Sequence, residues 1–388
     1  MQMTSRSHPK TNGFVPGLEG IIAAQTQLSA IDGKKGQLVI SGYPLEEIAS
    51  QATFEELIYL LWYHHLPTTK ELNDFARQLT QWRTLPDATL SLLSYAAKEK
   101  KTVMDALRMA VGTLDLELAT EPNDRLRLAC AIQARMPMVV AAYWRLRQGE
   151  APILEVPEMG FAASYLYLLT GETPAPEQAK ALETYLNTVA EHGLNASAFT
   201  ARVISSTHTD LLSAVVGAIG ALKGPLHGGA PGPALDMVFE IREMDRAEAV
   251  LREKLDRGER LMGFGHRVYK VHDPRAAVLA DAAEKLYEEA GDRALYELAR
   301  HVEEKAIELL VEYKPGRHLK TNVEFYTALL LHGIGLETEL FTPTFAVART
   351  AGWIAHCFEQ VDHGRIIRPK ALYQGRQDAR YVPLSERD

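Results

Sequence analysis

The sequence has few cysteines, no long apolar run and no excess of positive charge, and each absence excludes a class of protein. Cys130 and Cys357 are the only cysteines, which excludes a disulfide framework and a four-cysteine zinc site and is typical of the reducing cytoplasm, where we expect the chain. No stretch of about 18 apolar residues occurs and the first residues lack an apolar signal core, so neither a membrane span nor export is expected. The net charge of −8 provides no basic field for nucleic acid or an anionic membrane.

The sequence does contain enough apolar material for a large core. Its 388 residues, of which 46% are hydrophobic, predict two domains. Helical spacing dominates from about residue 53 onward. Two short β-like runs, Ile21-Ile22 and residues 38–40, lie on either side of the turn Asp32-Gly33. We therefore expect a mainly α fold with short N-terminal strands.

The most informative stretch is GFGHRVYKVHDPR, which ends at Arg275. Gly263 and Gly265 allow the backbone to take positive φ close to a ligand, directly before His266. Asp273-Pro274 predicts a helix start, with Asp as the N-cap and Pro as the first helical residue. Arg275 then lies in a first turn, where main-chain amides and the helix dipole favour an anion. This pattern suits a site for a carboxylate-bearing substrate, and the alternative is a surface loop with a satisfied histidine.

This stretch resembles the signature of the citrate synthase family, and the resemblance extends from about Gly17 to Gly375. It implies a homodimeric, nearly all-α acyltransferase that condenses acetyl-CoA with oxaloacetate and hydrolyses the thioester to citrate. No metal or redox cofactor is implied, and coenzyme A arrives as the thioester co-substrate. The implied large, dimer-forming helical domain comprises residues 16–222 and 331–376, and residues 223–330 form a small domain that closes over the site. Residues 1–15 and 377–388 are expected to be tails.

The resemblance implies three catalytic residues, His227, His266 and Glu324. Glu324 would remove a proton from the acyl methyl group, His227 would hydrogen-bond the enol oxygen that forms, and His266 would polarise the oxaloacetate carbonyl. His227 also precedes an expected helix start, where the dipole favours a neutral imidazole. Glu324 departs from the family, which normally has aspartate here, and its extra methylene moves the carboxylate by up to about 1.5 Å on an unchanged backbone.

The implied substrate-binding residues are mostly arginines, which bind carboxylates in bidentate geometry. They are His192, Arg275, Arg349 and, from the partner subunit, Arg368. The backbone of one short segment is implied to meet coenzyme A, with Arg260 and Lys314 as candidate phosphate partners. This segment consists of Glu259, Arg260, Leu261, Met262 and Gly263.

Residues 196–222 are dense in alanine, serine and glycine. Small side chains let helices approach closely, so the segment predicts a tightly packed helix pair. In the citrate synthase family the corresponding helices form the dimer interface, and the alternative is an ordinary buried pair.

Three alternative functions stay open from the sequence. The enzyme could prefer propionyl-CoA and make 2-methylcitrate, because one methylene in a pocket is worth only about 1–3 kcal/mol. The chain could be a catalytically weak relative that regulates a partner, which only Glu324 favours. A histidine-based metal hydrolase is the third, and the sequence contains no HExxH-like helix to support it.

Overall fold

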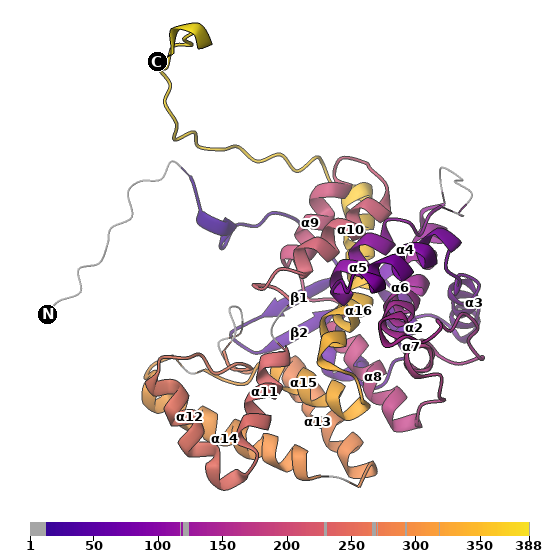
Figure 1. The fold of residues 1–388 in the computed structure, drawn as a ribbon, viewed down its shortest axis with the longest axis vertical. Coiled ribbons are helices and arrows are strands. Elements are labelled where there is room, and N and C mark those ends of the chain that lie inside the picture. The colour runs from indigo at the N-terminus through magenta and orange to yellow at the C-terminus, as the bar shows by residue number, and fades with distance from the viewer. Residues whose placement is uncertain are drawn as a thin grey trace, which may run out of the picture.

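The computed structural model describes residues 13–116, 118, 124–228, 231–265, 269, 271–291, 293–317 and 319–387. Helices make up most of it, joined by short connections (Figure 1). The helices of the N-terminal half are α1 (Leu45–Ile48), α2 (Phe54–Tyr63), α3 (Thr69–Thr80), α4 (Asp87–Lys98), α5 (Val103–Val111), α6 (Arg125–Gln148), α7 (Phe161–Thr170) and α8 (Pro176–Val189). Those of the C-terminal half are α9 (Ala196–Ser205), α10 (Leu211–Leu222), α11 (Pro231–Ile241), α12 (Ala247–Asp256), α13 (Pro274–Glu289), α14 (Ala294–Tyr313), α15 (Val323–Ile334) and α16 (Phe341–His363). Short 3-10 turns are η1 (Pro16–Leu18), η2 (Met244–Arg246), η3 (Thr338–Leu340) and η4 (Leu384–Glu386).

The β-structure is a small antiparallel sheet in the order β1-β2-β3. Its strands are β1 (Ser29–Asp32), β2 (Gln37–Ile40) and β3 (Tyr43–Pro44). The strand expected at residues 38–40 is confirmed, but the prediction at Ile21-Ile22 is wrong, because β2 pairs with β1. Ile21 and Ile22 are 49% and 89% exposed, so they have neither a partner strand nor the half-buried surface that stabilises β-structure. The mainly α fold with short N-terminal strands is otherwise as expected.

Helix α16 is the centre of the larger group of helices. It packs against α2, α6, α8, α9 and α10, and almost all of its residues from Phe341 to Gln360 are buried. A helix that is buried on all sides needs apolar residues all round, which the sequence of α16 provides. Arg349 lies in the middle of this helix and is only 2% exposed.

The small-residue segment forms the helix pair that it predicts. Helices α9 and α10 pack against each other, and a Cβ added at Gly217 would lie 2.2 Å from Cδ1 of Ile204. A larger residue at position 217 would force the Ile204 side chain to move, so glycine lets the two helices pack closely here. The role of the pair in a dimer stays a prediction.

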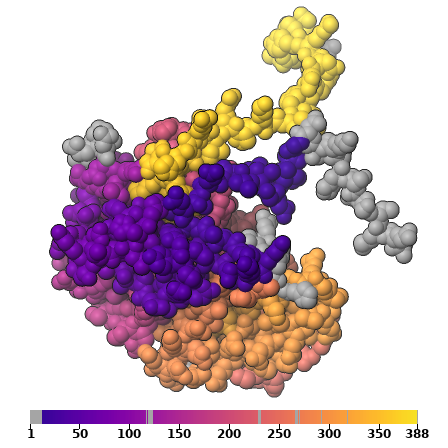
Figure 2. All heavy atoms as spheres, turned by 180° about the vertical axis from the view of Figure 1, so that it is seen from behind, coloured from indigo at the N-terminus to yellow at the C-terminus, as the bar shows by residue number. Residues whose placement is uncertain are grey.

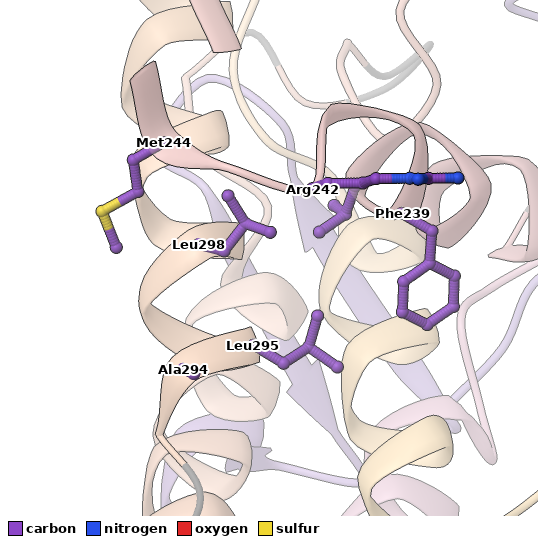
Figure 3. A pocket seen from close by; sticks show the side chains of 7 residues that line it. Phe239, Arg242, Met244, Ala294, Leu295 and Leu298 are labelled. Atoms are coloured by element: carbon purple, nitrogen blue, oxygen red, sulfur yellow. The ribbon is translucent and has the colours of Figure 1, made fainter. Parts of the chain in front are cut away.

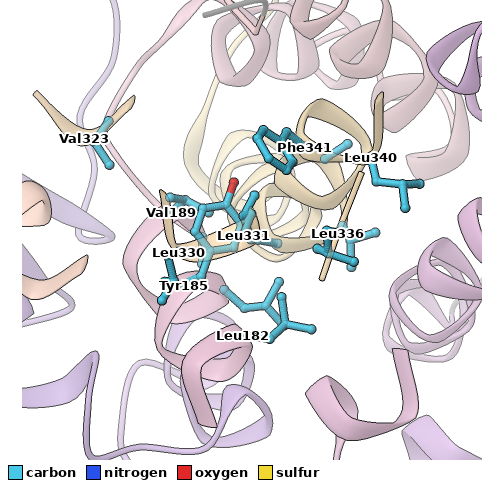
Figure 4. Close-up of a cluster of buried hydrophobic side chains, with 14 of the residues drawn as sticks. Leu182, Tyr185, Val189, Val323, Leu330, Leu331, Leu336, Leu340 and Phe341 are labelled. Atoms are coloured by element: carbon cyan, nitrogen blue, oxygen red, sulfur yellow. The ribbon is translucent and has the colours of Figure 1, made fainter. Parts of the chain in front are cut away.

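Helices α11 to α15 lie together at the bottom of Figure 1, where α13 packs on α15 and α12 on α14. This group is joined to the rest through α8, which packs on both α13 and α15. Tyr185 and Val189 of α8 lie beside Leu330 and Leu331 of α15 in this shared core (Figure 4). The proposed division into two domains stays a prediction.

The C-terminal segment after α16 leaves the body of the molecule (Figures 1 and 2). Nearly all residues from 364 to 387 are exposed. Tyr381 and Leu384, for example, are 82% and 75% exposed. Arg368 belongs to this segment, so its side chain lies outside the helical core.

Candidate functional site

The glycine-flanked loop before His266 is joined to the start of α15 by a short antiparallel pairing. Gly265 N donates to the Lys320 carbonyl at 2.7 Å and Asn322 N donates to the Gly263 carbonyl at 2.9 Å. The Asn322 side chain adds a third bond, from Nδ2 to the Gly265 carbonyl at 2.9 Å. Glu324 is the second residue of α15, so this pairing fixes the position of the candidate base relative to the loop. His266 itself lies outside the described residues.

Position 263 requires glycine for two reasons, the backbone conformation and the lack of space for a side chain. Its φ is +86°, and a Cβ added there would lie 2.9 Å from Cβ of Phe325. The loop therefore lies directly against the first turn of α15.

Glu324 is half-buried at the N-terminus of α15, where its main-chain N–H donates to Asn322 Oδ1 at 3.0 Å. Burial raises the pKa of its carboxyl, and the nearby Asp273 raises this pKa further. The charges of Arg275 and Arg260 act in the opposite direction. A carboxylate whose pKa is raised is a stronger base than an ordinary one, which suits proton abstraction near neutral pH.

Arg275 is held by Asp273 in two charged hydrogen bonds. Its Nε donates to Oδ1 at 3.0 Å and its Nη2 donates to Oδ2 at 2.8 Å. Asp273 also accepts from the main-chain N–H of Arg275 at 3.1 Å and of Val323 at 3.2 Å. It therefore joins the starts of α13 and α15, as well as being the N-cap that the sequence predicts. Burial opposes the charge of Arg275, but Asp273 outweighs it and raises the pKa of the guanidinium.

His192 follows α8 and contacts Tyr269, the one described residue between Gly265 and Val271. Its Nε2 lies 3.0 Å from the Tyr269 hydroxyl. The Tyr269 ring also lies under the Arg275 guanidinium, with Cζ 5.9 Å from the ring centre. Tyr269 therefore lies between two predicted substrate-binding residues, one in the connection after α8 and the other in the first turn of α13.

His227 lies against the start of α9, where Ser197 contacts its Nε2 twice. The Ser197 hydroxyl is 2.8 Å from Nε2, and the Ser197 main-chain N–H points at the same atom from 3.3 Å. A main-chain N–H cannot rotate away, so Nε2 must be the acceptor and we assign the ring proton to Nδ1. Burial and the charge of Arg349 lower the pKa of His227 to about 4. The imidazole is therefore neutral at pH 7, as expected from the sequence.

Arg349 projects from the buried middle of α16. Its Nε donates to the Val189 carbonyl at 2.5 Å, and its guanidinium lies 4.6 Å from the centre of the Phe345 ring. It forms no ion pair with any residue that the structure describes. Burial and the charge of Arg275 together lower its pKa to about 10, against the opposing charge of Glu191. The two arginines thus lie close enough to repel each other.

These electrostatic effects place four predicted residues in one region: Arg349 acts on His227, and Arg275 acts on both Arg349 and Glu324. Two buried guanidiniums in one region favour a ligand with more than one negative charge.

Only part of the segment from Glu259 to Gly263, which is predicted to bind coenzyme A, lies near these residues. Glu259 and Arg260 are exposed, whereas Leu261 and Gly263 are buried and Met262 is half-buried. Arg260 acts on the carboxyl of Glu324, but Glu259 pairs with Arg257 at 2.8 Å. Lys314 is exposed at the end of α14.

The structure does not bring Arg368 to the other site residues within one subunit. It is exposed on the segment after α16. No hydrogen bond or ion pair joins it to the described residues of the site. Its predicted role requires a second copy of the chain.

Sequence reasoning missed several residues that hold the site together. Asp273 was expected only as a helix cap, and Tyr269 and Ser197 were not singled out. The local signal at Ser197 is the cap of α9, because the Asn195 side chain caps this helix and so places Ser197 in its first turn. Nothing in the sequence places Tyr269 beside His192.

A separate pocket of about 390 Å³ lies between α11 and α14 (Figure 3). Its lining is apolar apart from Arg242, and it contains none of the predicted site residues. Within the described part of the chain, none of the helices combines the length and the apolar character that a membrane span requires. The same residues contain no cluster of three or more potential metal ligands.

Comparison with known proteins identifies the family. The family model described as citrate synthase, C-terminal domain, matches residues 17–370. A citrate synthase of Haloferax volcanii is 43% identical over 380 residues, covering 96% of this chain and 98% of the relative. A 2-methylcitrate synthase of Shewanella oneidensis is 36% identical, covering 96% and 97%.

A solved structure agrees with these sequence matches. The citrate synthase of Thermoplasma acidophilum, solved as a ternary complex, superposes with a TM-score of 0.86 at 32% identity, covering 96% of this chain and 99% of that one. Its complex holds carboxymethyl coenzyme A and oxaloacetate. This chain therefore belongs to the citrate synthase family, the acyltransferases that condense acetyl-CoA with oxaloacetate to form citrate.

Proposed function

We propose that this chain condenses acetyl-CoA with oxaloacetate and hydrolyses the resulting thioester to citrate and coenzyme A, with Glu324 as the base. His227 donates a hydrogen bond to the thioester carbonyl, and His266 polarises the oxaloacetate carbonyl. His192, Arg275 and Arg349 hold the oxaloacetate carboxylates. These roles are those that the resemblance to the citrate synthase family implies, and the geometry of the described residues supports them.

The observation that carries the proposal is the state of Arg349. It is 2% exposed and forms no ion pair with any described residue. A buried guanidinium that no carboxylate contacts directly is unfavourable, and a carboxylate of the substrate relieves this cost in bidentate geometry. Arg275, which acts on Arg349 electrostatically, is placed to receive the second carboxylate. A dicarboxylate such as oxaloacetate matches this pair.

The proton transfers follow from the protonation states of Glu324 and His227. Burial raises the pKa of Glu324, which makes its carboxylate a stronger base for taking a proton from the methyl group beside the thioester. The negative charge then moves to the thioester oxygen. His227 is neutral and carries its proton on Nδ1, which gives that oxygen a hydrogen-bond donor as the charge develops. The resulting enol attacks the oxaloacetate carbonyl, whose oxygen becomes the citrate hydroxyl.

The remaining contacts involve coenzyme A and a second subunit. The backbone from Glu259 to Gly263 meets coenzyme A, with Arg260 and Lys314 at its phosphates. Both side chains are basic and exposed, as partners of a phosphate at the surface would be. Arg368 enters the site of the partner in a homodimer, which agrees with its exposure on the segment after α16.

Substitution of Glu324 tests the proposal. Glu324→Gln keeps the size and removes the base, so it should slow the exchange of acetyl-CoA methyl protons with solvent by about a hundredfold or more, while oxaloacetate still binds. Exchange is measured by NMR in D₂O, and oxaloacetate binding by calorimetry. Unchanged exchange in Glu324→Gln would show that another group is the base.

Glu324→Asp separates an active enzyme from a weak, regulatory relative. If the site is built around glutamate, the shorter side chain misplaces the carboxylate by about 1 Å and costs about a hundredfold in rate. A much faster Glu324→Asp enzyme would mean that the site is still shaped for aspartate, and the regulatory function would then gain support.

A second candidate function is the formation of 2-methylcitrate from propionyl-CoA. Its support is the match to a 2-methylcitrate synthase, which covers nearly the whole chain at 36% identity. The chemistry and the residues named above would be the same, with one more methylene to accommodate beside Glu324.

A further inference from the structure

A buried row of charged and polar side chains lies behind the substrate-binding residues, and no step of the proposed reaction uses it. It consists of Glu359, Arg202, His356 and Glu191, each at most 8% exposed. Arg202 Nη1 donates to Glu359 Oε2 at 2.9 Å and contacts His356 Nδ1 at 2.8 Å. On its other side, His356 Nε2 lies 3.2 Å from the carboxylate of Glu191.

The hydrogen-bond donors fix the protons along this row. A guanidinium can only donate, so Nδ1 of His356 must be a bare acceptor. The ring proton then lies on Nε2, which donates to Glu191, and we assign His356 as neutral. Arg202 polarises this imidazole and strengthens its bond to Glu191. The row therefore ends in an ionised Glu191, next to the site.

Glu191 fixes the main chain on the far side of His192. Its Oε1 accepts from Gly193 N at 2.6 Å and from the Ser29 hydroxyl at 2.8 Å. Gly193 has a φ of +61°, so the chain turns sharply directly after His192. These bonds hold that turn against β1 and so set the direction from which His192 enters the site.

Glu191 is also the nearby anion that supports the charge of Arg349. Burial acts to raise the pKa of Glu191, but its interactions with His356, Arg349 and Ser29 outweigh burial and lower it. The charge of Glu191 in turn raises the pKa of Arg349 against the effect of burial. Its Oε2 packs against the backbone of α16, because a Cβ added at Gly352 would lie 2.7 Å from this oxygen. Gly352 thus makes room for the carboxylate one turn beyond Arg349.

We propose that Glu191, held by Arg202 and His356, is a positioning residue for the dicarboxylate substrate. It orients His192 through Gly193 and supplies the charge that balances Arg349. This inference depends on the proposed binding of oxaloacetate by His192 and Arg349. It predicts that loss of the Glu191 charge weakens the binding of oxaloacetate far more than that of acetyl-CoA.

The test is Glu191→Gln, which keeps the shape and one acceptor oxygen but removes the charge. We expect the KM and the calorimetric Kd for oxaloacetate to rise by about tenfold or more, as is usual when the partner of a ligand-binding group is removed. The KM for acetyl-CoA should change less than about threefold. Glu191→Asp keeps the charge and should recover part of the oxaloacetate affinity. A purely structural role would instead lower the melting temperature and leave the two KM values unchanged.

Glu55→Gln is the matched control. Glu55 is another buried carboxylate, 7% exposed, which accepts from Phe161 N at 2.8 Å and belongs to no part of the site. This variant should lose stability but keep the oxaloacetate Kd. Equal Kd values for Glu191→Gln and the parent would overturn the inference, and so would an equal rise in Glu55→Gln.

Two further measurements decide the remaining outcomes. If Glu191→Gln does not fold, Ser29→Ala removes one donor to Glu191 from the half-buried β1, and an unchanged oxaloacetate Kd in this variant then overturns the inference. If the parent chain does not bind oxaloacetate at all, the proposed function has failed, and the inference that depends on it is withdrawn.

Discussion

Replacement of Gly263 by alanine tests whether the loop positions the candidate base. The added Cβ would lie 2.9 Å from Cβ of Phe325, about 0.5 Å closer than the 3.4 Å at which ordinary contact begins. Neither side can yield freely, because Asn322 N donates to the Gly263 carbonyl and Phe325 belongs to the first turn of α15. The first turn of α15 must therefore shift, and Glu324, which directly precedes Phe325 in this turn, is displaced with it.

The size of the effect follows from that displacement. A misplacement of about 1 Å costs on the order of a hundredfold in rate, so about 0.5 Å should cost about tenfold. The positive φ of +86° adds a separate destabilisation of roughly 1–2 kcal/mol. We expect Gly263→Ala to exchange acetyl-CoA methyl protons about tenfold more slowly than the parent, measured by NMR in D₂O.

Gly291→Ala is the matched control for backbone strain. Gly291 follows α13, has a φ of +72° and has no heavy atom within 4 Å of an added Cβ. It should lose a similar stability and keep the parental exchange rate. If the two variants exchange at the same rate, the packing of Gly263 on Phe325 does not position Glu324 and the reasoning is wrong.

Three more predictions concern assembly, pH and the acyl group. Arg368→Ala mixed with Arg275→Ala should regain activity in heterodimers, because one site is then intact; no recovery in verified heterodimers would place both arginines in one site. His227 has a pKa of about 4, below its ordinary value of 6.5, so the unfolded chain binds more protons between these values and stability should fall as the pH drops through this window. His227→Gln should flatten this part of the pH–stability curve. If the unfolding midpoint changes by the same amount between pH 7 and pH 5 in the parent and in His227→Gln, the assignment is wrong. Acetyl-CoA and propionyl-CoA offered separately with oxaloacetate should give the higher kcat/KM for acetyl-CoA, and the reverse order would favour 2-methylcitrate synthesis.

The sequence by itself determined the features that depend on neighbouring residues. Asp273-Pro274 starts α13 as the cap and first residue, and Thr53 and Glu56 form the capping box that starts α2. Such signals succeed because the cap and the amide that it satisfies are only two or three residues apart. Asp245 and Glu248 show their limit. Their spacing is that of a helix cap, but a 3-10 turn (Met244–Arg246) precedes α12, which has no side-chain cap.

Only the tertiary structure decided how distant segments meet. It brings Asp273 to Val323, 50 positions further along the chain, and seats Glu191 between β1 and α16 through Ser29 and His356. It also left Ile21 and Ile22 without a strand to pair with. Local propensity contains no information on which partner a side chain will meet across the fold. Those contacts are selected by burial of the whole core, because a buried charge is stable only where packing supplies its partner.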